Sequence, residues 1–98
     1  MSDRIRVETE SALKYAKTLS QKAQECRELA DEANSICDSL INAWEGESGV
    51  EMQEKLREWS GKQKKIAENL ENTVNRITTV VNDIIEKDRR AAQYNSSF

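Results

Sequence analysis

The chain contains no proline and no histidine, and it has only three glycines. Proline is the strongest helix breaker, so its absence allows long uninterrupted helices. Without histidine, the commonest general base and the commonest transition-metal ligand are missing. The sequence also holds no nucleophile–base pair, phosphate-binding loop or calcium-binding spacing. We therefore expect no catalysis, no cofactor and no metal site.

Cysteine is scarce as well, with only Cys26 and Cys37 present. Eleven positions along one expected helix correspond to a rise of roughly 16 Å. A disulfide requires Cα atoms within about 7 Å of each other, so these two cannot pair within one chain. We interpret both as small buried hydrophobic residues.

Long apolar runs are absent too. No stretch approaches the ~20 apolar residues that cross a bilayer, so no stable membrane insertion is expected. The first ten residues, MSDRIRVETE, have no apolar core, and no cleavable secretory signal is expected. The net charge is −3. The basic run at 62–65 is interpreted as solvated surface, and nucleic-acid binding is not expected.

What the sequence does contain is one strong turn signal between two long helical patterns. Two of the three glycines, Gly46 and Gly49, lie within residues 42–49. Gly46 is able to adopt the left-handed conformation that closes a helix, and Ser48 with Glu51 has capping-box spacing. The pattern predicts an all-α helix-turn-helix hairpin in one domain, with helix 1 over about 9–42, the turn at 43–48, helix 2 over about 49–90 and a mobile tail over about 91–98. Thr9 is the expected cap of helix 1, and residues 1–8 are compatible with a short extended arm.

Apolar residues recur every seven positions in both helices. In helix 1 the two rows are rich in alanine, which predicts a thin seam and close approach of a second helix. In helix 2 the rows carry larger side chains, which are expected to face the alanines. The residues assigned to core or dimer packing are Leu19, Ala23, Cys26, Ala30, Cys37, Leu40, Leu56, Trp59, Ile66, Leu70, Ile77 and Val81.

The apolar surface is too wide for one hairpin. Tyr15, Leu29, Ile36 and Ile41 form a second group beside the first stripe. Residues 25–58 carry a net charge of −7, whereas residues 1–24 and 59–98 each carry +2. Head-to-tail packing of two hairpins brings opposite charges together. We therefore predict an antiparallel four-helix bundle made from two chains.

The tripeptide Trp44-Glu45-Gly46, in the middle of a chain of about a hundred residues, resembles the turn of the WXG family of ESAT-like proteins. The resemblance covers nearly the whole chain. It implies a helical hairpin that dimerises and leaves the cell folded through a type VII secretion system, driven by a membrane-bound ATPase. It also implies that Trp44 and Gly46 form part of the export signal.

In that family a second motif lies near the end of helix 2, where an aromatic residue is followed four residues later by an acid. Here Asp88 supplies the acid, and Ile84 stands where the aromatic is found. The late aromatic Tyr94 is followed four residues later by Phe98 rather than by an acid. Either the signal accepts Ile84, or a partner protein supplies the aromatic. Ile84, Asp88, Tyr94 and Phe98 are the candidate residues of this C-terminal signal.

The leading interpretation is a non-enzymatic secreted protein that pairs with itself or with a paralogous WXG-type chain and is recognised by the secretion ATPase. An alternative is an intracellular helical adaptor, or chaperone-like partner, of a larger secreted toxin. A membrane-active effector is a third interpretation, which the polar outer surface disfavours.

Overall fold

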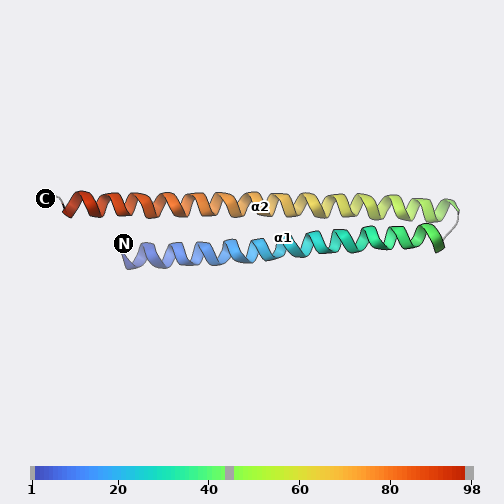
Figure 1. Cartoon of the computed structure of the whole chain (residues 1–98), viewed down its shortest axis with the longest axis horizontal. Coiled ribbons are helices and arrows are strands. Elements are labelled where there is room, and N and C mark those ends of the chain that lie inside the picture. The colour runs from blue at the N-terminus through green and yellow to red at the C-terminus, as the bar shows by residue number, and fades with distance from the viewer. Residues whose placement is uncertain (1, 44–45, 97–98) are drawn as a thin grey trace. The chain divides into compact units, whose positions relative to one another are not determined.

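Two helices account for the fold. A computed structural model describes residues 2–43 and 46–96, except for the side chains at 41–43. Helix α1 spans Asp3–Ala43, and helix α2 spans Glu47–Ser96. The described residues contain no strand. Figure 1 shows the chain reversing direction between α1 and α2. The expected all-α helical hairpin is confirmed. The antiparallel dimer is a proposal.

Helix α1 begins earlier than the sequence led us to expect. The side-chain oxygen of Ser2 accepts a hydrogen bond of 3.2 Å from the amide of Ile5, and the Ser2 carbonyl accepts one of 3.0 Å from the amide of Arg6. Ser2 is thus the N-cap, and Asp3 places a negative charge in the first turn, where the helix dipole favours it. The expected start at Thr9 and the extended arm over 1–8 were wrong for residues 3–8, which are helical.

Helix α2 also begins before its expected position near Gly49. The amide of Val50 donates a hydrogen bond of 3.3 Å to the carbonyl of Gly46, which makes Gly46 the residue that opens α2. Its φ of 107° lies in the region that glycine adopts without a Cβ clash. Ser48 therefore lies inside the first turn of α2 and not at its N-cap. Of the expected turn at 43–48, residues 44 and 45 fall outside the described part of the chain.

The C-terminal end is more helical than expected. Within the expected mobile tail over about 91–98, where helix was expected to reach at most about Gln93, residues 91–96 continue α2 to Ser96. No glycine or proline interrupts this segment, and alanine and glutamine favour helix. Arg89 and Arg90 both pair with Glu86, at 2.9 and 3.2 Å, which adds local support of the kind found three and four residues apart on a helix.

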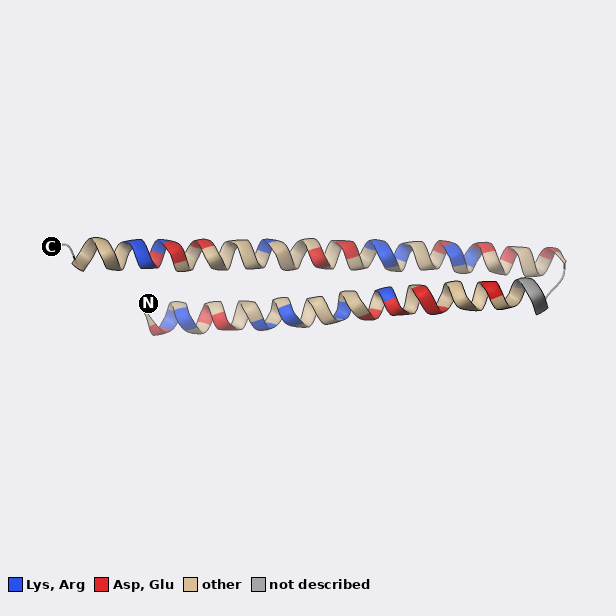
Figure 2. Cartoon of the chain, viewed as in Figure 1, with Lys and Arg blue, Asp and Glu red and all other residues tan. Residues whose placement is uncertain are grey.

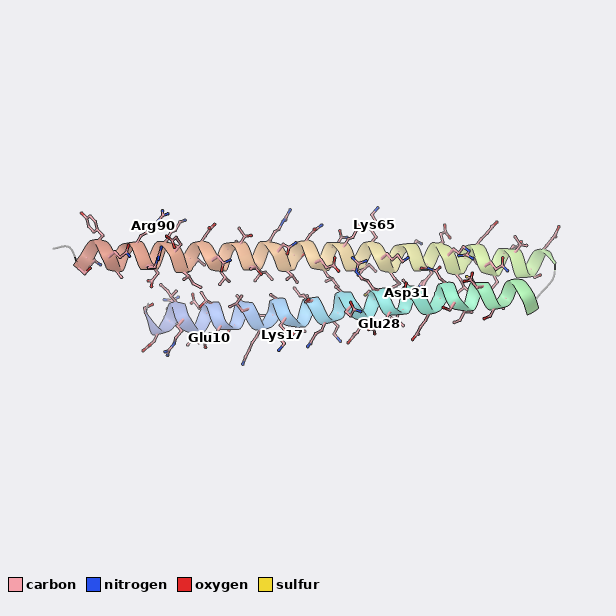
Figure 3. All side chains as sticks on the ribbon, in the orientation of Figure 1. Glu10, Lys17, Glu28, Asp31, Lys65 and Arg90 are labelled. Carbon is pink, nitrogen blue, oxygen red and sulfur yellow. The ribbon has the colours of Figure 1, made fainter. Side chains whose placement is uncertain are left out.

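The structure divides into two compact units, which we describe separately. Unit 1 comprises Met1–Ser20 with Glu71–Phe98, and unit 2 comprises Gln21–Leu70. In each unit a segment of α1 packs against a segment of α2. Figure 3 shows charged side chains directed away from the other helix, namely Glu10, Lys17 and Arg90 in unit 1 and Lys65 in unit 2.

Unit 2 is built around a seam of very small residues. The buried positions, which we call the small-residue seam, are Ala23, Ala30, Ala33 and Cys37 on α1, and Gly49, Ser60 and Ala67 on α2. Because the fully buried side chains of this seam are so small, the two backbones come close enough for side chain-to-backbone hydrogen bonds. The Ser60 hydroxyl donates to the Ala30 carbonyl at 3.1 Å, and the Cys37 thiol donates weakly to the Gln53 carbonyl at 3.6 Å.

The expected match of large residues on helix 2 against alanines on helix 1 was wrong for the row that contains Trp59 and Ile66. These side chains are 40% and 44% exposed, while their neighbours Ser60 and Ala67 are buried against α1. Small residues meet small residues because this arrangement brings the helices closest together. The large apolar side chains are left at the flank of the seam.

Unit 1 has its own small core. Thr9, Ala16 and Val81 are buried, and the Thr9 hydroxyl donates to the Arg6 carbonyl at 2.9 Å, so burial leaves that group satisfied. Within residues 2–43 and 46–96, neither helix combines the length and the apolar character needed to cross a bilayer.

Candidate interaction surfaces and signal residues

Six large apolar side chains are exposed among the described residues of unit 2, and five of them, all except Val50, follow a seven-residue spacing. Leu29 and Ile36 lie seven residues apart on α1, and Met52, Trp59 and Ile66 follow the same spacing on α2. Each stands one position before a residue of the rows that face the seam. In an antiparallel helix pair, equivalent heptad positions flank the seam on the same side. These five residues therefore lie on one flank of the seam, and we call them the apolar stripe.

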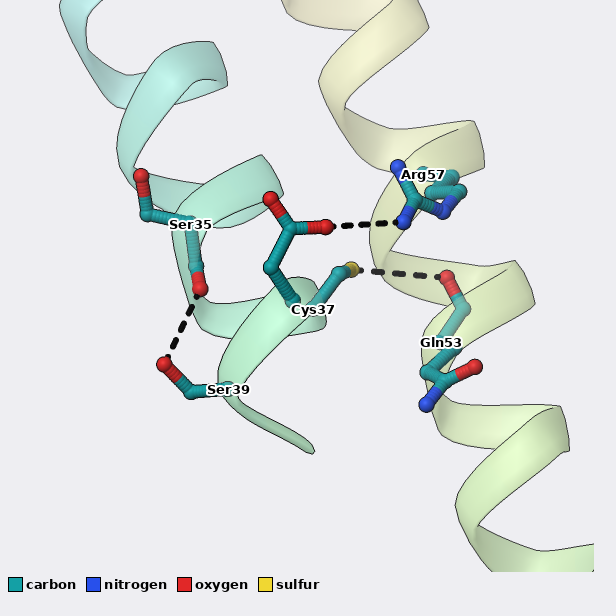
Figure 4. A network of polar contacts seen from close by, with 6 residues as sticks. Ser35, Cys37, Ser39, Gln53 and Arg57 are labelled. Carbon is teal, nitrogen blue, oxygen red and sulfur yellow. Dashed lines mark hydrogen bonds and ion pairs between the residues drawn. The ribbon is translucent and has the colours of Figure 1, made fainter. Parts of the chain in front are cut away.

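The opposite flank of the seam carries an ion pair between the two helices. Arg57 and Asp38, each one position after a row residue, form an ion pair of 3.2 Å across the two helices. Figure 4 shows this pair beside the Cys37–Gln53 contact, together with the local bond from the Ser39 hydroxyl to the Ser35 carbonyl. Both ends of the ion pair are well exposed, so it contributes little to stability. The two flanks of unit 2 thus differ in composition, with the ion pair and the exposed Val50 on one flank and the apolar stripe on the other.

Unit 1 contains an apolar cavity between its two helix segments, with a volume of about 250 Å³. Its apolar lining consists of Ile5, Ala12, Ile77, Val80, Val81 and Ile84. The two polar residues that also line it are already engaged. Thr9 donates to the Arg6 carbonyl, and Glu8 pairs with Arg4 at 3.1 Å. The cavity therefore presents an apolar surface, and the polar residues that line it already have a hydrogen-bond or ion-pair partner.

The twelve residues predicted for packing fall into three groups. Ala23, Ala30, Cys37 and Val81 are buried. The residues that are half-buried along the helix contacts are Leu19, Cys26, Leu40, Leu56, Leu70 and Ile77. Trp59 and Ile66 are exposed members of the apolar stripe. Both cysteines are free, and Cys37 packs as the small buried residue that the sequence predicted.

The candidate signal residues belong to both units. Gly46 is part of unit 2, and Ile84, Asp88 and Tyr94 are part of unit 1. Ile84 and Asp88 share one face of α2, because residues four apart lie one above the other on a helix. Ile84 lines the cavity, Asp88 is half-buried and Tyr94 is well exposed. Trp44 and Phe98 lie outside the described residues, so the structure does not test those two assignments.

Charge differs between the units. Unit 2 contains eleven acidic and seven basic residues, a net charge of −4, and unit 1 contains seven acidic and eight basic residues, a net charge of +1. Figure 2 shows the acidic residues concentrated along the second half of α1 and the first turns of α2, which both belong to unit 2. At the start of α2, Glu47, Glu51 and Glu54 line a shallow depression with Gly46 and Val50. Over residues 2–43 and 46–96, no group of three or more Cys, Asp or Glu side chains is arranged to hold a metal ion.

Sequence reasoning missed the burial of Thr9 and the cavity beside it. A signal for Thr9 was present, because the row of Ala16, Ala23 and Ala30 reaches Thr9 when it is extended back by seven. No such signal exists for the cavity. It depends on the volumes of side chains brought together from Ile5–Ala12 and from Ile77–Ile84, which are far apart in the sequence.

Comparison with known proteins gives one match. The model of the WXG100 family, described as proteins of 100 residues with WXG, matches residues 4–89. No curated protein and no solved structure matches the chain significantly.

Proposed function

The chain belongs to the WXG100 family, the family of ESAT-like type VII secretion substrates, and from this premise we propose that it is exported folded, as an antiparallel homodimer, and acts outside the cell as an effector or secretion partner. The match covers most of the chain, from Arg4 to Arg89. The family supplies the transport route. The family also implies a dimer, and the surfaces described above give separate support for it.

The apolar stripe is the observation that supports dimerisation. A core made largely of alanine removes few methylene groups from water, and each buried methylene contributes only about 0.8 kcal/mol. Five large apolar side chains of unit 2 are instead exposed on one flank. Exposed apolar side chains gathered on one flank mark an interaction site on soluble proteins. A second hairpin laid on the stripe completes a four-helix bundle.

We assign recognition by the secretion ATPase to Trp44 and Gly46, together with Ile84, Asp88, Tyr94 and Phe98. The conformation of Gly46 supports its part in this assignment. A φ of 107° at the residue that opens α2 fixes how the chain enters the helix, directly after Trp44 and Glu45. The exposed Tyr94 supplies an aromatic group on the last turns of α2.

Sedimentation equilibrium tests the dimer. At micromolar to millimolar concentration the purified chain should sediment with twice its monomer mass of 11.2 kDa. A single 11.2 kDa species over that range would overturn the homodimer. It would instead favour the adaptor interpretation, in which the apolar stripe covers helices of a different, larger protein.

Export is tested in a bacterium that carries a type VII system. Trp44→Ala should leave the dimer intact and abolish export. Lys17→Ala is a suitable control, because the Lys17 side chain is exposed and directed away from the other helix. Undiminished export of the Trp44→Ala chain would refute the role of Trp44.

A further inference from the structure

The cavity of unit 1 has the size and chemistry to accept an aromatic side chain. A cavity of about 150 Å³ lined by Leu, Ile and Phe stays dry and binds benzene. This one measures about 250 Å³, has aliphatic walls, and its two polar lining residues are engaged elsewhere. It opens to solvent beside Val80, which is 55% exposed, and it is large enough for a two-ring indole.

Trp59 is the side chain on the page that fits this description. It is a large indole, it is 40% exposed, and it belongs to the apolar stripe of unit 2. The same seven-residue row of α2 continues through Ile66 and Thr73 to Val80, which lines the cavity. Trp59 belongs to unit 2 and the cavity to unit 1, and a second copy of the chain is able to supply this indole to the cavity.

Antiparallel pairing makes this delivery possible. When two α2 helices pair about a two-fold axis placed midway between Ile66 and Thr73, Trp59 of one chain meets Val80 of the other, and Ile66 meets Thr73. In parallel pairing Trp59 meets Trp59, and both cavities stay empty. The net charges of −4 on unit 2 and +1 on unit 1 favour the antiparallel arrangement, because it places the unit 2 of one chain against the unit 1 of the other.

We propose that each chain of the homodimer inserts Trp59 into the apolar cavity of unit 1 of its partner, between the partner's α1 and α2. This inference rests on the homodimer of the proposed function and adds its register and its central contact. Two equivalent tryptophans are buried per dimer, one at each cavity. The cavity is thus the receptor half of the dimer interface.

Fluorescence tests the insertion. In a Trp44→Phe chain, Trp59 is the only tryptophan. Its emission should shift to shorter wavelength, and its quenching by acrylamide should fall, over the concentration range in which sedimentation shows dimer formation. An emission spectrum and quenching constant that stay the same in monomer and dimer would overturn the insertion.

Filling the cavity is the second test. Ala12→Phe places a ring among the lining residues, and Ser11→Phe, one position away on the exposed side of α1, is the matched control. Ala12→Phe should raise the dimer Kd at least about 100-fold, because both tryptophan contacts of the kind that dominate interfaces are lost. Ser11→Phe should leave Kd within about threefold. Helix content by circular dichroism shows whether Ala12→Phe remains folded. If that variant is unfolded, the cross-linking below decides.

Cross-linking tests the register without touching Trp59 or the cavity. In a background of Cys26→Ala and Cys37→Ala, an Ile66→Cys chain is mixed with a Thr73→Cys chain that carries a tag of different mass. Mild oxidation should give the mixed 66–73 disulfide. A dimer that cross-links 66 to 66 instead refutes this register while leaving the homodimer standing. A wild-type chain that stays monomeric defeats the proposed function itself, so the two failures are distinguishable.

Discussion

The hydroxyl of Ser60 donates a hydrogen bond of 3.1 Å to the backbone carbonyl of Ala30, thirty residues away on the other helix. A side chain as short as serine reaches a facing backbone only where two helices lie very close together. Both residues are almost completely inaccessible to solvent. This contact therefore identifies the tightest point of unit 2 and ties α2 to α1 at a defined level.

Replacing Ser60 with alanine should destabilise the chain by about 1 kcal/mol, the usual net value of a buried hydrogen bond. The control is Ser39→Ala. The Ser39 hydroxyl donates at 3.2 Å to Ser35 on its own helix, at an exposed position. That variant should be neutral or slightly stabilising, because alanine has the higher helix propensity. Urea unfolding of both variants measures the difference, and equal stabilities would contradict a structural role for the Ser60 bond.

Enlarging a side chain in the small-residue seam should force the helices apart. Ala30→Leu adds three carbon atoms at a position with no exposed surface, and overpacking of this kind usually costs about 1–3 kcal/mol. Ala92→Leu makes the same chemical change at an exposed position of α2 and should alter stability by less than about 0.5 kcal/mol. Thermal unfolding of the two variants at matched concentration checks the prediction. A seam that accepted leucine at 30 without loss would not be tightly packed.

The glycines at 46 and 61 should respond to alanine in opposite directions. Gly46 has a φ of 107°, a backbone conformation that strains alanine even though the space beside it is open, so Gly46→Ala should cost about 1–3 kcal/mol. Gly61 lies within α2, and an added Cβ meets nothing within 4 Å. Gly61→Ala should therefore stabilise the chain by roughly 0.5–1 kcal/mol. Denaturant midpoints of the two variants, compared with wild type, should move to opposite sides.

The pKa of Glu86 should lie below its usual value of 4.5, chiefly because the Arg89 side chain hydrogen-bonds to the carboxylate, with further attraction from Arg90. A pKa lowered in the folded state means that the ionised carboxylate favours folding. That contribution is fully present above the unfolded pKa and is lost as the pH falls through the folded pKa.

Carboxyl NMR titration measures this pKa directly. Arg89→Gln should raise it toward the usual value, and Arg90→Gln should raise it less, because Arg89 makes the larger contribution. Equal shifts in the two variants would show that general attraction, and not the hydrogen bond from Arg89, lowers the pKa.

The sequence predicted the turn and the face of α1 that packs, because seven-residue spacing determines which residues share a helix face. Ala16, Ala23, Ala30 and Cys37 are buried where the pattern placed them. On α2 the same reasoning failed for Trp59 and Ile66, which are exposed. Trp59 and Ser60 lie in adjacent rows, and periodicity alone does not say which row approaches the partner helix. The choice depends on how closely two backbones pack, which is a property of both helices together.

The helix ends were missed for a local reason. Thr9 has the chemistry of a cap, but Ser2 occupies the cap position and is followed by an acid that suits the helix dipole. Thr9 instead bonds to the carbonyl of Arg6 from within the helix. The sequence shows which residues are able to cap a helix. Which of two such residues is the cap depends on whether the segment that follows the first one is helical.

The burial of Cys37 provides a built-in reporter of helix separation. Its thiol is inaccessible to solvent and donates a weak hydrogen bond to the Gln53 carbonyl, whereas Cys26 is only half-buried. Alkylation of Cys37 therefore requires the two helix segments of unit 2 to separate transiently, and the alkylation rate measures how often they separate. The same alkylation reaction can be applied to molecules trapped in the exporter. It then shows whether the two helices of the hairpin stay packed together or separate during transport.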